Sequence, residues 1–269
     1  MRYKSEKIVE KIPVIVSNCT LYDIIDIFVK ERVPVVGIGD KYITIDNIVK
    51  ILVLNRENLH KILFRDVSPF TRKLSVFMKR TSFRNIISKL YGRNEKYMIL
   101  KADKFNIIGA ITPRSLFSYF SKYLLLNDLN YFYYKRFRCV VTPNTTIVGT
   151  LRKMNKYNSN FSPMIFKGKF RGIVSSYDII SYLIDEEVIN KVNKRKNDYF
   201  FETSIADFCG YFVPVIDVMD LNVSKVRKIL SKYSVLAIVR NNLLEYFVDD
   251  YNLIDYTRQK LIKRWFDEI

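Results

Sequence analysis

The chain has one histidine and three cysteines among its 269 residues. The single histidine, His60, excludes a metal site built on two imidazoles, and no nucleophile lies near it in the sequence. The cysteines, Cys19, Cys139 and Cys209, are far apart, odd in number and form no C-x-x-C pair. Neither a zinc knuckle nor a disulfide framework is therefore expected, and buried reduced thiols are the simplest interpretation.

Long apolar runs are missing too. No stretch approaches the roughly 18–20 apolar residues that span a bilayer, and no apolar segment of a secretory signal follows the first residues. We therefore expect a cytoplasmic protein without a membrane partner. The phosphate-loop pattern G-x-x-x-x-G-K-[ST] is also absent, so ATP hydrolysis is not indicated, and the chain is not expected to be an enzyme.

Acidic residues are few beside basic ones: 27 Asp and Glu against 45 Lys and Arg give a net charge of +18. This charge favours anionic partners. Basic residues are interleaved with aromatic residues over residues 131–138, and such a stretch can bind single-stranded DNA or RNA. The alternative is compositional: Lys, Asn, Ile and Tyr are all abundant, and the aromatic residues would pack the two halves of the chain together.

Hydrophobic residues make up 49% of the chain, and its length suits two ordinary domains. A unit of strand, capped helix, hairpin and second helix occurs four times. The third copy is the clearest: residues 139–141 form a strand, Lys167 and Gly168 a hairpin turn, and Ser175 begins the closing helix. Between them, one helical face carries Ile147, Leu151 and Met154.

The other copies follow the same order of elements. In the first copy the predicted opening strand is residues 14–16 and the helix cap is Thr20. In the second copy the strand is residues 74–78 and the cap is Thr81 or Ser82. In the fourth copy the strand is residues 213–217 and a helix follows at 223–233. Corresponding positions in the closing helices are Asn47, Ser115, Asp178 and Asn252, spaced 63 to 74 residues apart. A nearly constant spacing of this size indicates a repeat.

The segments Val140-Val-Thr-Pro-Asn-Thr-Thr-Ile147, Ser162-Pro-Met-Ile-Phe166 and Gly172-Ile-Val-Ser-Ser-Tyr-Asp-Ile-Ile180 resemble a CBS domain, named for cystathionine beta-synthase. The resemblance implies an α/β (α+β) fold of four β-α-β-β-α motifs in two pseudo-symmetric paired modules. The first pair would span residues 1–125, with motifs at about 8–55 and 65–124. The second pair would span residues 126–269, with motifs at about 137–186 and 205–258.

The resemblance also implies a function. CBS motifs are regulatory and non-catalytic, so the chain would sense an adenine nucleotide, AMP, ADP or ATP, as a bound ligand rather than a catalytic cofactor. Two alternatives stay open: a basic CBS protein that binds DNA or RNA, and a structural or interaction protein with degenerate sites. CBS proteins often form homodimers, and a homodimer is a further alternative.

The family pattern Gly-h-h-Thr/Ser-x-x-Asp/Asn is complete in the third copy, as Gly172, Ser175 and Asp178. The resemblance implies that Asp178 accepts hydrogen bonds from the ribose hydroxyls. It also implies that Ser175 and the N-terminus of the helix contact the phosphate. Thr142, in the turn after the first strand, would face the adenine. Because Ser, Thr, Asp and Asn are also the residues that begin helices, simple capping is the alternative for these positions.

The other copies depart from the pattern. The first keeps Thr44 and Asn47, although Lys41 replaces the glycine. The second keeps Gly109 and Thr112, has the shorter Ser115 at the ribose position, and offers Arg114 to a phosphate. The fourth has Tyr246, Asp249 and Asn252. Because a carboxylate at the hydroxyl position would repel phosphate, we expect the fourth site to be empty or only structural.

Overall fold

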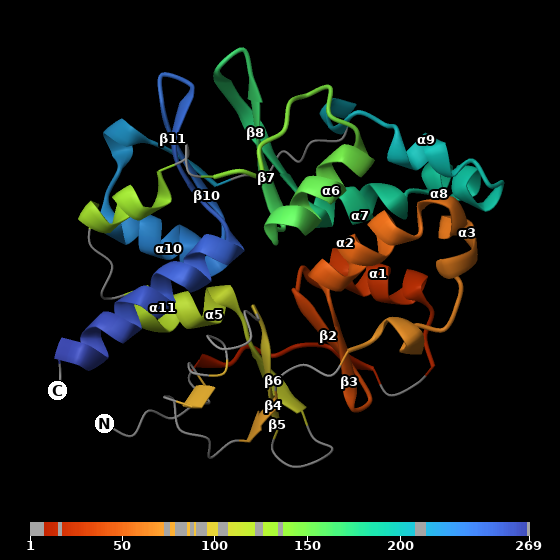
Figure 1. Cartoon of the computed structure of the whole chain (residues 1–269), viewed down its shortest axis with the longest axis horizontal. Helices are drawn as coiled ribbons and strands as arrows, with labels where there is room; N and C mark the ends of the chain where they lie inside the picture. The colour runs from red at the N-terminus through yellow and green to blue at the C-terminus, as the bar shows by residue number, and fades with distance from the viewer. Residues whose placement is uncertain are drawn as a thin grey trace.

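Four similar units make up the computed structural model (Figure 1). It describes residues 8–15, 18–72, 76–78, 85–86, 89, 96–101, 107–121, 126–133, 137–207 and 214–267. The predicted α/β (α+β) class, with four β-α-β-β-α motifs in two pseudo-symmetric paired modules, is confirmed. The predicted cap at Thr81 or Ser82 and the thiol of Cys209 lie outside the described residues.

The first two motifs have three-stranded sheets. The elements of the first are β1 (Val14–Ile15), α1 (Leu21–Glu31), β2 (Val35–Ile38), β3 (Lys41–Thr44) and α2 (Ile45–Leu54), followed by α3 (Leu59–Ile62). Those described in the second are β4 (Val76–Met78), β5 (Met98–Lys101), β6 (Ile107–Ile111) and α5 (Pro113–Phe120). In each sheet the first strand pairs in parallel with the second, which forms an antiparallel hairpin with the third.

The third and fourth motifs repeat this plan after η5 (Leu126–Phe132). The third contains α6 (Ile147–Tyr157), β7 (Phe161–Phe166), β8 (Lys169–Ser175) and α7 (Ser176–Leu183). Its predicted opening strand is reduced to one parallel bridge, Val141 to Met164. The fourth contains β9 (Val215–Asp217), α10 (Val223–Tyr233), β10 (Leu236–Arg240), β11 (Leu243–Val248) and α11 (Asp250–Asp267). Two helices that the repeat did not predict, α8 (Glu186–Asn193) and α9 (Asn197–Phe201), connect these motifs.

Turn and cap residues explain where these elements end. Lys167 and Gly168 both have positive φ, 49° and 75°, as the central residues of a tight two-residue hairpin turn require. Thr20 caps α1 and forms a reciprocal capping box with Asp23. The predicted turn and the predicted cap are both confirmed.

The sheets of neighbouring motifs pack face to face. Val35 and Tyr42 of the first motif share a buried cluster with Ile99 and Ala110 of the second, and a similar cluster joins the third and fourth sheets. The segment before β1 also bonds to the second motif, because Glu10 and Ala110 exchange two backbone hydrogen bonds of 2.9 Å. The division of the chain at residues 125 and 126 stays a prediction.

Helices from the two pairs meet in the middle of the molecule, between the sheets of the first pair and those of the second (Figure 1). Helix α2 packs on α6 and α1 on α7, whereas α5 packs on α10 and α11. The N-termini of the closing helices, which carry the predicted site residues, therefore lie close to residues from the other pair.

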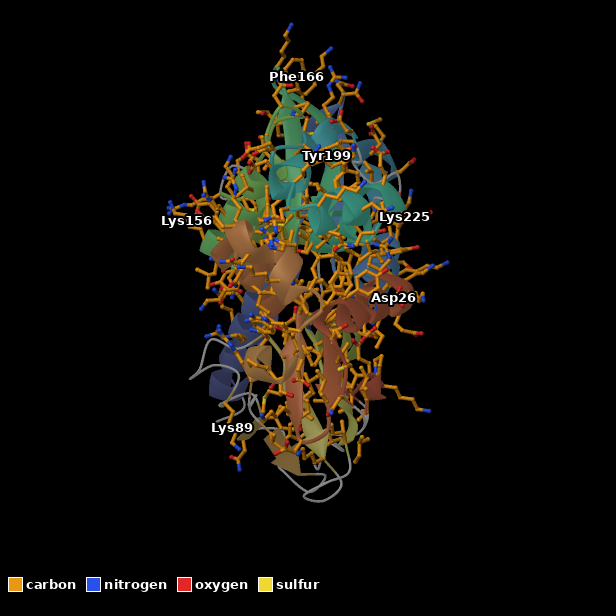
Figure 2. All side chains as sticks on the ribbon, turned by 90° about the vertical axis from the view of Figure 1, so that its right-hand side faces the viewer. Asp26, Lys89, Lys156, Phe166, Tyr199 and Lys225 are labelled. Atoms are coloured by element: carbon orange, nitrogen blue, oxygen red, sulfur yellow. The ribbon has the colours of Figure 1, made fainter. Side chains whose placement is uncertain are left out.

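The basic side chains are spread over the surface. Figure 2 shows Lys89, Lys156 and Lys225 in separate regions of one view. The linker aromatic Phe132 is buried, and Tyr131 bonds to Asp255 of α11. Among the described helices, none is long and apolar enough to cross a membrane.

Candidate functional site

The closing helix of each motif begins with the same hydrogen-bond arrangement. The N-cap side chain accepts the N–H of the residue three positions later, at 3.1–3.2 Å in three motifs and 2.8 Å in the fourth. That residue's side chain accepts the N-cap N–H at 2.7–3.2 Å. The pairs are Thr44 with Asn47, Thr112 with Ser115, Ser175 with Asp178, and Asp249 with Asn252. All four predicted pairs therefore cap helices, and a second role in binding stays a prediction.

Asp178 in the third motif uses one carboxylate oxygen for this cap. Its Oδ2 accepts the N–H of Ser175 at 2.9 Å and the Ser175 hydroxyl at 2.6 Å. Its Oδ1 lies 3.8 Å from Nη1 of Arg32. Gly172 precedes this junction with a φ of 150°, a value that side chains disfavour. The three residues of the complete pattern therefore surround the start of α7.

Arg32 was missed by the sequence analysis. It ends α1 with a left-handed backbone (φ 51°), and its guanidinium lies 5.8 Å from the ring centre of Tyr177 in α7. Its side chain is 58% exposed, so its charge is accessible to a ligand. No sequence signal could have found this residue, because only the packing of α1 on α7 brings it to the third motif.

The predicted residues of the first motif, and Thr142, lie in polar local networks. Asn47 Oδ1 accepts both the N–H and the hydroxyl of Thr44, at 3.2 and 2.9 Å, and both residues are buried. Thr142 is exposed, and its hydroxyl lies 3.1 Å from that of Thr145 in the turn before α6. Contact of either group with a nucleotide stays a prediction.

Arg114 in the second motif has an internal carboxylate partner. Its Nε and Nη2 donate to Glu10 at 3.1 and 3.0 Å, and Nη1 donates to the carbonyl of Lys232 at 3.2 Å. Gly109 permits the close approach, because a Cβ there would lie 2.2 Å from the carbonyl oxygen of Glu10. A phosphate that binds Arg114 would therefore compete with Glu10.

A buried lysine connects all four motifs. Lys96, before β5, lies 2.5 Å from Asp46 of the first motif and 2.9 Å from Asp250 of the fourth, and donates to the carbonyl of Asn158 in the third at 3.2 Å. Burial alone would lower the pKa of Lys96, but Asp250 and Asp46 outweigh it and hold this pKa above its ordinary value. Burial raises the pKa of Asp46, and Lys96 partly opposes that effect.

A small cavity of about 60 Å³ lies where the motifs meet. Thr112 and Arg114 of the second motif line it together with Arg32 and Tyr177, and the acids Glu10 and Asp250 also reach it. The structure thus brings two predicted residues, Thr112 and Arg114, to the neighbourhood of the third-motif site. The space suits a phosphate-sized group and is too small for a whole nucleotide.

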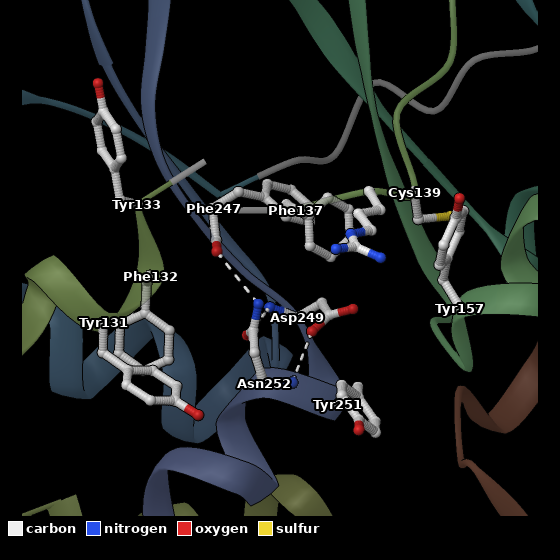
Figure 3. Close-up of a pocket in the computed structure, with 11 residues that line it drawn as sticks. Tyr131, Phe132, Tyr133, Phe137, Cys139, Tyr157, Phe247, Asp249, Tyr251 and Asn252 are labelled. Carbon is white, nitrogen blue, oxygen red and sulfur yellow. Dashed lines mark hydrogen bonds between the residues drawn. The ribbon is translucent and has the colours of Figure 1, made fainter. Parts of the chain in front are cut away.

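A larger cavity, of about 330 Å³, lies beside Asp249 and Asn252 of the fourth motif (Figure 3). Seven aromatic residues line it: the linker residues 131–133, then Phe137, Tyr157, Phe247 and Tyr251. The sequence predicts that this site is empty of ligand or only structural. It also left open whether the linker aromatics bind nucleic acid or pack, and they pack around a ligand-sized space.

Asp249 is a buried carboxyl group at the N-cap of α11. Its Oδ1 accepts the N–H of Asn252 at 2.8 Å, and its Oδ2 lies 2.5 Å from the Ser159 hydroxyl. That hydroxyl also lies 2.7 Å from the carbonyl of Phe161 and has one proton to donate, so a proton on Asp249 would satisfy both contacts. Burial and the neighbouring Asp250 raise the pKa of Asp249 to about 7.

Comparison with known proteins agrees with this architecture. Residues 138–185 match the family model of the CBS domain. Protein MJ1225 of Methanocaldococcus jannaschii, described as a candidate archaeal homologue of g-AMPK, is 15% identical over 94% of this chain and 99% of its own, with a TM-score of 0.80. An uncharacterized conserved protein of Pyrococcus horikoshii is 18% identical over 96% of this chain and 100% of its own, with a TM-score of 0.53.

Among the curated proteins compared, none matches the chain. The structural likeness at this low identity establishes the fold, and the family model establishes the third motif. With the four repeated β-α-β-β-α units, these findings confirm the resemblance to CBS-domain proteins noted in the sequence: residues 138–185 match the CBS domain, and the chain as a whole shares the fold of MJ1225.

Proposed function

We propose that the protein is a regulatory protein that binds an adenine nucleotide, AMP, ADP or ATP, at its third motif. Asp178 would accept hydrogen bonds from the ribose hydroxyls, and Ser175 with the N-terminus of α7 would meet the phosphate. The observation that carries the proposal is the position of Oδ1 of Asp178, which takes no part in the helix cap and lies 3.8 Å from Nη1 of Arg32 at the start of α7. The ribose diol of a nucleotide can donate to the carboxylate oxygen, and its phosphate can pair with the guanidinium and the helix N-terminus.

The phosphate end of the ligand would point toward the central cavity. Arg32 and Arg114 line that cavity, and both can pair with phosphate oxygens. Glu10 and Asp250 line it as well, so a monophosphate would bind with less repulsion than a triphosphate. Because MJ1225 shares the fold and is described as a candidate homologue of g-AMPK, AMP is the first ligand to test.

Binding would act as a signal because the site includes more than one motif. Arg32 is the C-cap of α1 and Asp178 belongs to α7, and these helices pack on each other across the two pairs. A ligand that prefers one arrangement of these helices shifts the population toward it. No bond is made or broken in the proposed role. Thr44 and Asn47 form the proposed second site.

Calorimetric titration of the full chain with AMP, ADP and ATP tests the proposal. Asp178→Ala should weaken AMP binding by about tenfold or more, since the ribose contacts are lost. The matched control is Asp23→Ala, which removes the same kind of capping box from α1, where Asp23 Oδ2 accepts from the N–H and hydroxyl of Thr20 at 2.8 Å. An absence of AMP binding, or equal losses in the two variants, would reject the proposed site.

A further inference from the structure

The two hairpins of the second pair project from the same edge of the molecule (Figure 1). Strand β7 turns into β8 through Lys167 and Gly168, and β10 turns into β11 through Asn241 and Asn242. The N–H of Phe170 donates to the carbonyl of Asn242 at 2.8 Å, which holds the two hairpin ends together. We propose that these ends form a docking surface for an anionic lipid membrane.

Apolar side chains are exposed at the two ends. Phe166, the last residue of β7, is 37% exposed, and Leu243, the first residue of β11, is 50% exposed. Ile165 and Phe170 pack against the buried cluster between the third and fourth sheets, so the hairpins are fixed at their base. Phe166 lies at the far end of the molecule (Figure 2, top). Apolar side chains that project in this way can enter the boundary between lipid headgroups and acyl chains.

Basic side chains surround these apolar ones. Lys167, Lys169 and Arg171 are exposed, and neither β7 nor β8 contains an acidic residue. The second hairpin adds little charge, because its Arg240 is paired with Glu245. A basic residue close to an anionic membrane strengthens binding by about fivefold, so the charge of the first hairpin complements such a surface.

The corresponding hairpin of the first motif lacks these features. Strands β2 and β3 have four residues each, whereas β7 and β8 have six and seven. The turn between β2 and β3 contains Gly39 and Asp40, an acid in place of the lysine and no aromatic residue beside it. The length, ring and charge of the β7–β8 hairpin are therefore not required to build the motif, which points to a role in binding.

The chemistry of the surface favours lipid over nucleic acid. Both polyanions attract lysine and arginine, but bases gain affinity by stacking on aromatic faces, which Leu243 does not provide. Phe166 has one such face, and Nζ of Lys167 lies 5.5 Å from its ring centre. Docking on a surface needs no spanning helix, and none occurs among the described helices. The expected absence of a membrane partner, which rested on the missing long apolar run, would then be wrong.

Co-sedimentation of the full chain with vesicles tests the proposal. The chain should bind phosphatidylcholine vesicles that contain about 30% phosphatidylserine and should bind pure phosphatidylcholine much more weakly. Raising the salt concentration from about 0.1 to 1 M should release it, because the Debye length falls from about 10 to 3 Å.

Two double variants separate the apolar and basic contributions. Phe166→Ala with Leu243→Ala should weaken vesicle binding by about tenfold. Lys167→Glu with Lys169→Glu should weaken it by about a hundredfold, because attraction is replaced by repulsion. All four side chains are exposed, so thermal unfolding should stay close to that of the unchanged chain.

Matched controls change other surfaces by the same chemistry. Leu54→Ala removes a leucine that is 68% exposed at the end of α2. Lys50→Glu with Lys156→Glu reverses two exposed lysines of α2 and α6, and Lys156 lies well away from Phe166 (Figure 2). Neither control should lose more than about threefold in vesicle binding. No binding to the phosphatidylserine vesicles, or losses in the controls equal to those at the hairpins, would overturn the proposal.

Two other occupants of the surface are outcomes of the same variants. Retention of single-stranded DNA that the double lysine variant loses, without vesicle binding, would assign the surface to nucleic acid. A dimer in gel filtration that Phe166→Ala with Leu243→Ala dissociates would assign it to a second copy of the chain. Either result contradicts a membrane surface. AMP titration of these variants should match the unchanged chain, so this proposal and the nucleotide proposal fail separately.

Discussion

The second and fourth motifs hold corresponding positions in their pairs and have different sites. In each motif the closing helix begins beside a segment from the start of the same pair. A β-bridge from Glu10 to Ala110 holds this segment in the second motif, and one from Tyr133 to Tyr246 holds it in the fourth. That segment gives the second motif a carboxylate that pairs with Arg114, and the fourth an aromatic wall. The shared backbone is therefore surrounded by different side chains in the two motifs, a charged pair in the second and aromatic rings in the fourth.

Lys96 connects the four motifs, and its contacts hold the second and fourth motifs in their corresponding positions. Lys96→Met should lower the free energy of unfolding by about 3–5 kcal/mol, since it leaves the buried Asp250 and the half-buried Asp46 without their cation. Urea unfolding measures this change. Lys50→Met, at an exposed position of α2, is the control and should change stability by less than about 0.5 kcal/mol. Similar values for the two variants would show that the network does not hold the motifs together.

Asp249 should make the free energy of unfolding depend on pH. Thr112, at the same position of the second motif, has no ionisable group and contributes no such dependence. Its pKa rises from the ordinary 3.8 to about 7 in the folded protein. The stabilisation is then complete below about pH 4 and is lost as the pH rises through 7, by about 4 kcal/mol. Urea unfolding between pH 4 and 8 should show this loss in the unchanged chain and not in Asp249→Asn. Parallel curves for the two proteins would assign the group an ordinary pKa.

Gly109 and Tyr246 stand at the same position of the two motifs. Gly109→Ala should destabilise the chain by about 1–3 kcal/mol, because the new Cβ would lie 2.2 Å from the carbonyl oxygen of Glu10. Thermal unfolding measures the loss. Gly39→Ala is a contrasting variant: Gly39 has open space around it but a φ of 57°, so its cost would come from backbone strain alone. An unchanged midpoint for Gly109→Ala would mean that the Glu10 segment can move away.

Glu10 decides whether Arg114 is available. Glu10→Gln should increase the affinity of the third-motif site for AMP by about tenfold, because Arg114, which lines the cavity at the phosphate end of this site, loses its competing anion. Calorimetric titration of the otherwise unchanged chain with AMP measures this gain, and Glu31→Gln, at an exposed position that ends α1, is the control. No gain over Glu31→Gln would indicate that the carbonyl of Lys232 and the surrounding packing still hold Arg114.

Local patterns in the sequence predicted much of the fold and the positions of the candidate sites. Thr20, Thr44, Thr112 and Ser175 all begin helices, because a short side-chain oxygen satisfies a free N–H in the first turn. The turn at Lys167 and Gly168 follows from similarly local chemistry. Helices α8 and α9 were not predicted, since they lie outside the repeat.

The sequence by itself determined the repeat, the caps and the identity of the residue at each site position, because these depend on neighbours within a few residues. Only the tertiary structure decided that Arg32 meets Asp178, that Glu10 neutralises Arg114, and that Lys96 joins the four motifs. It also placed an aromatic cavity where Asp249 had suggested an empty site. Each of these contacts joins distant parts of the chain, and its geometry comes from how whole helices and sheets pack.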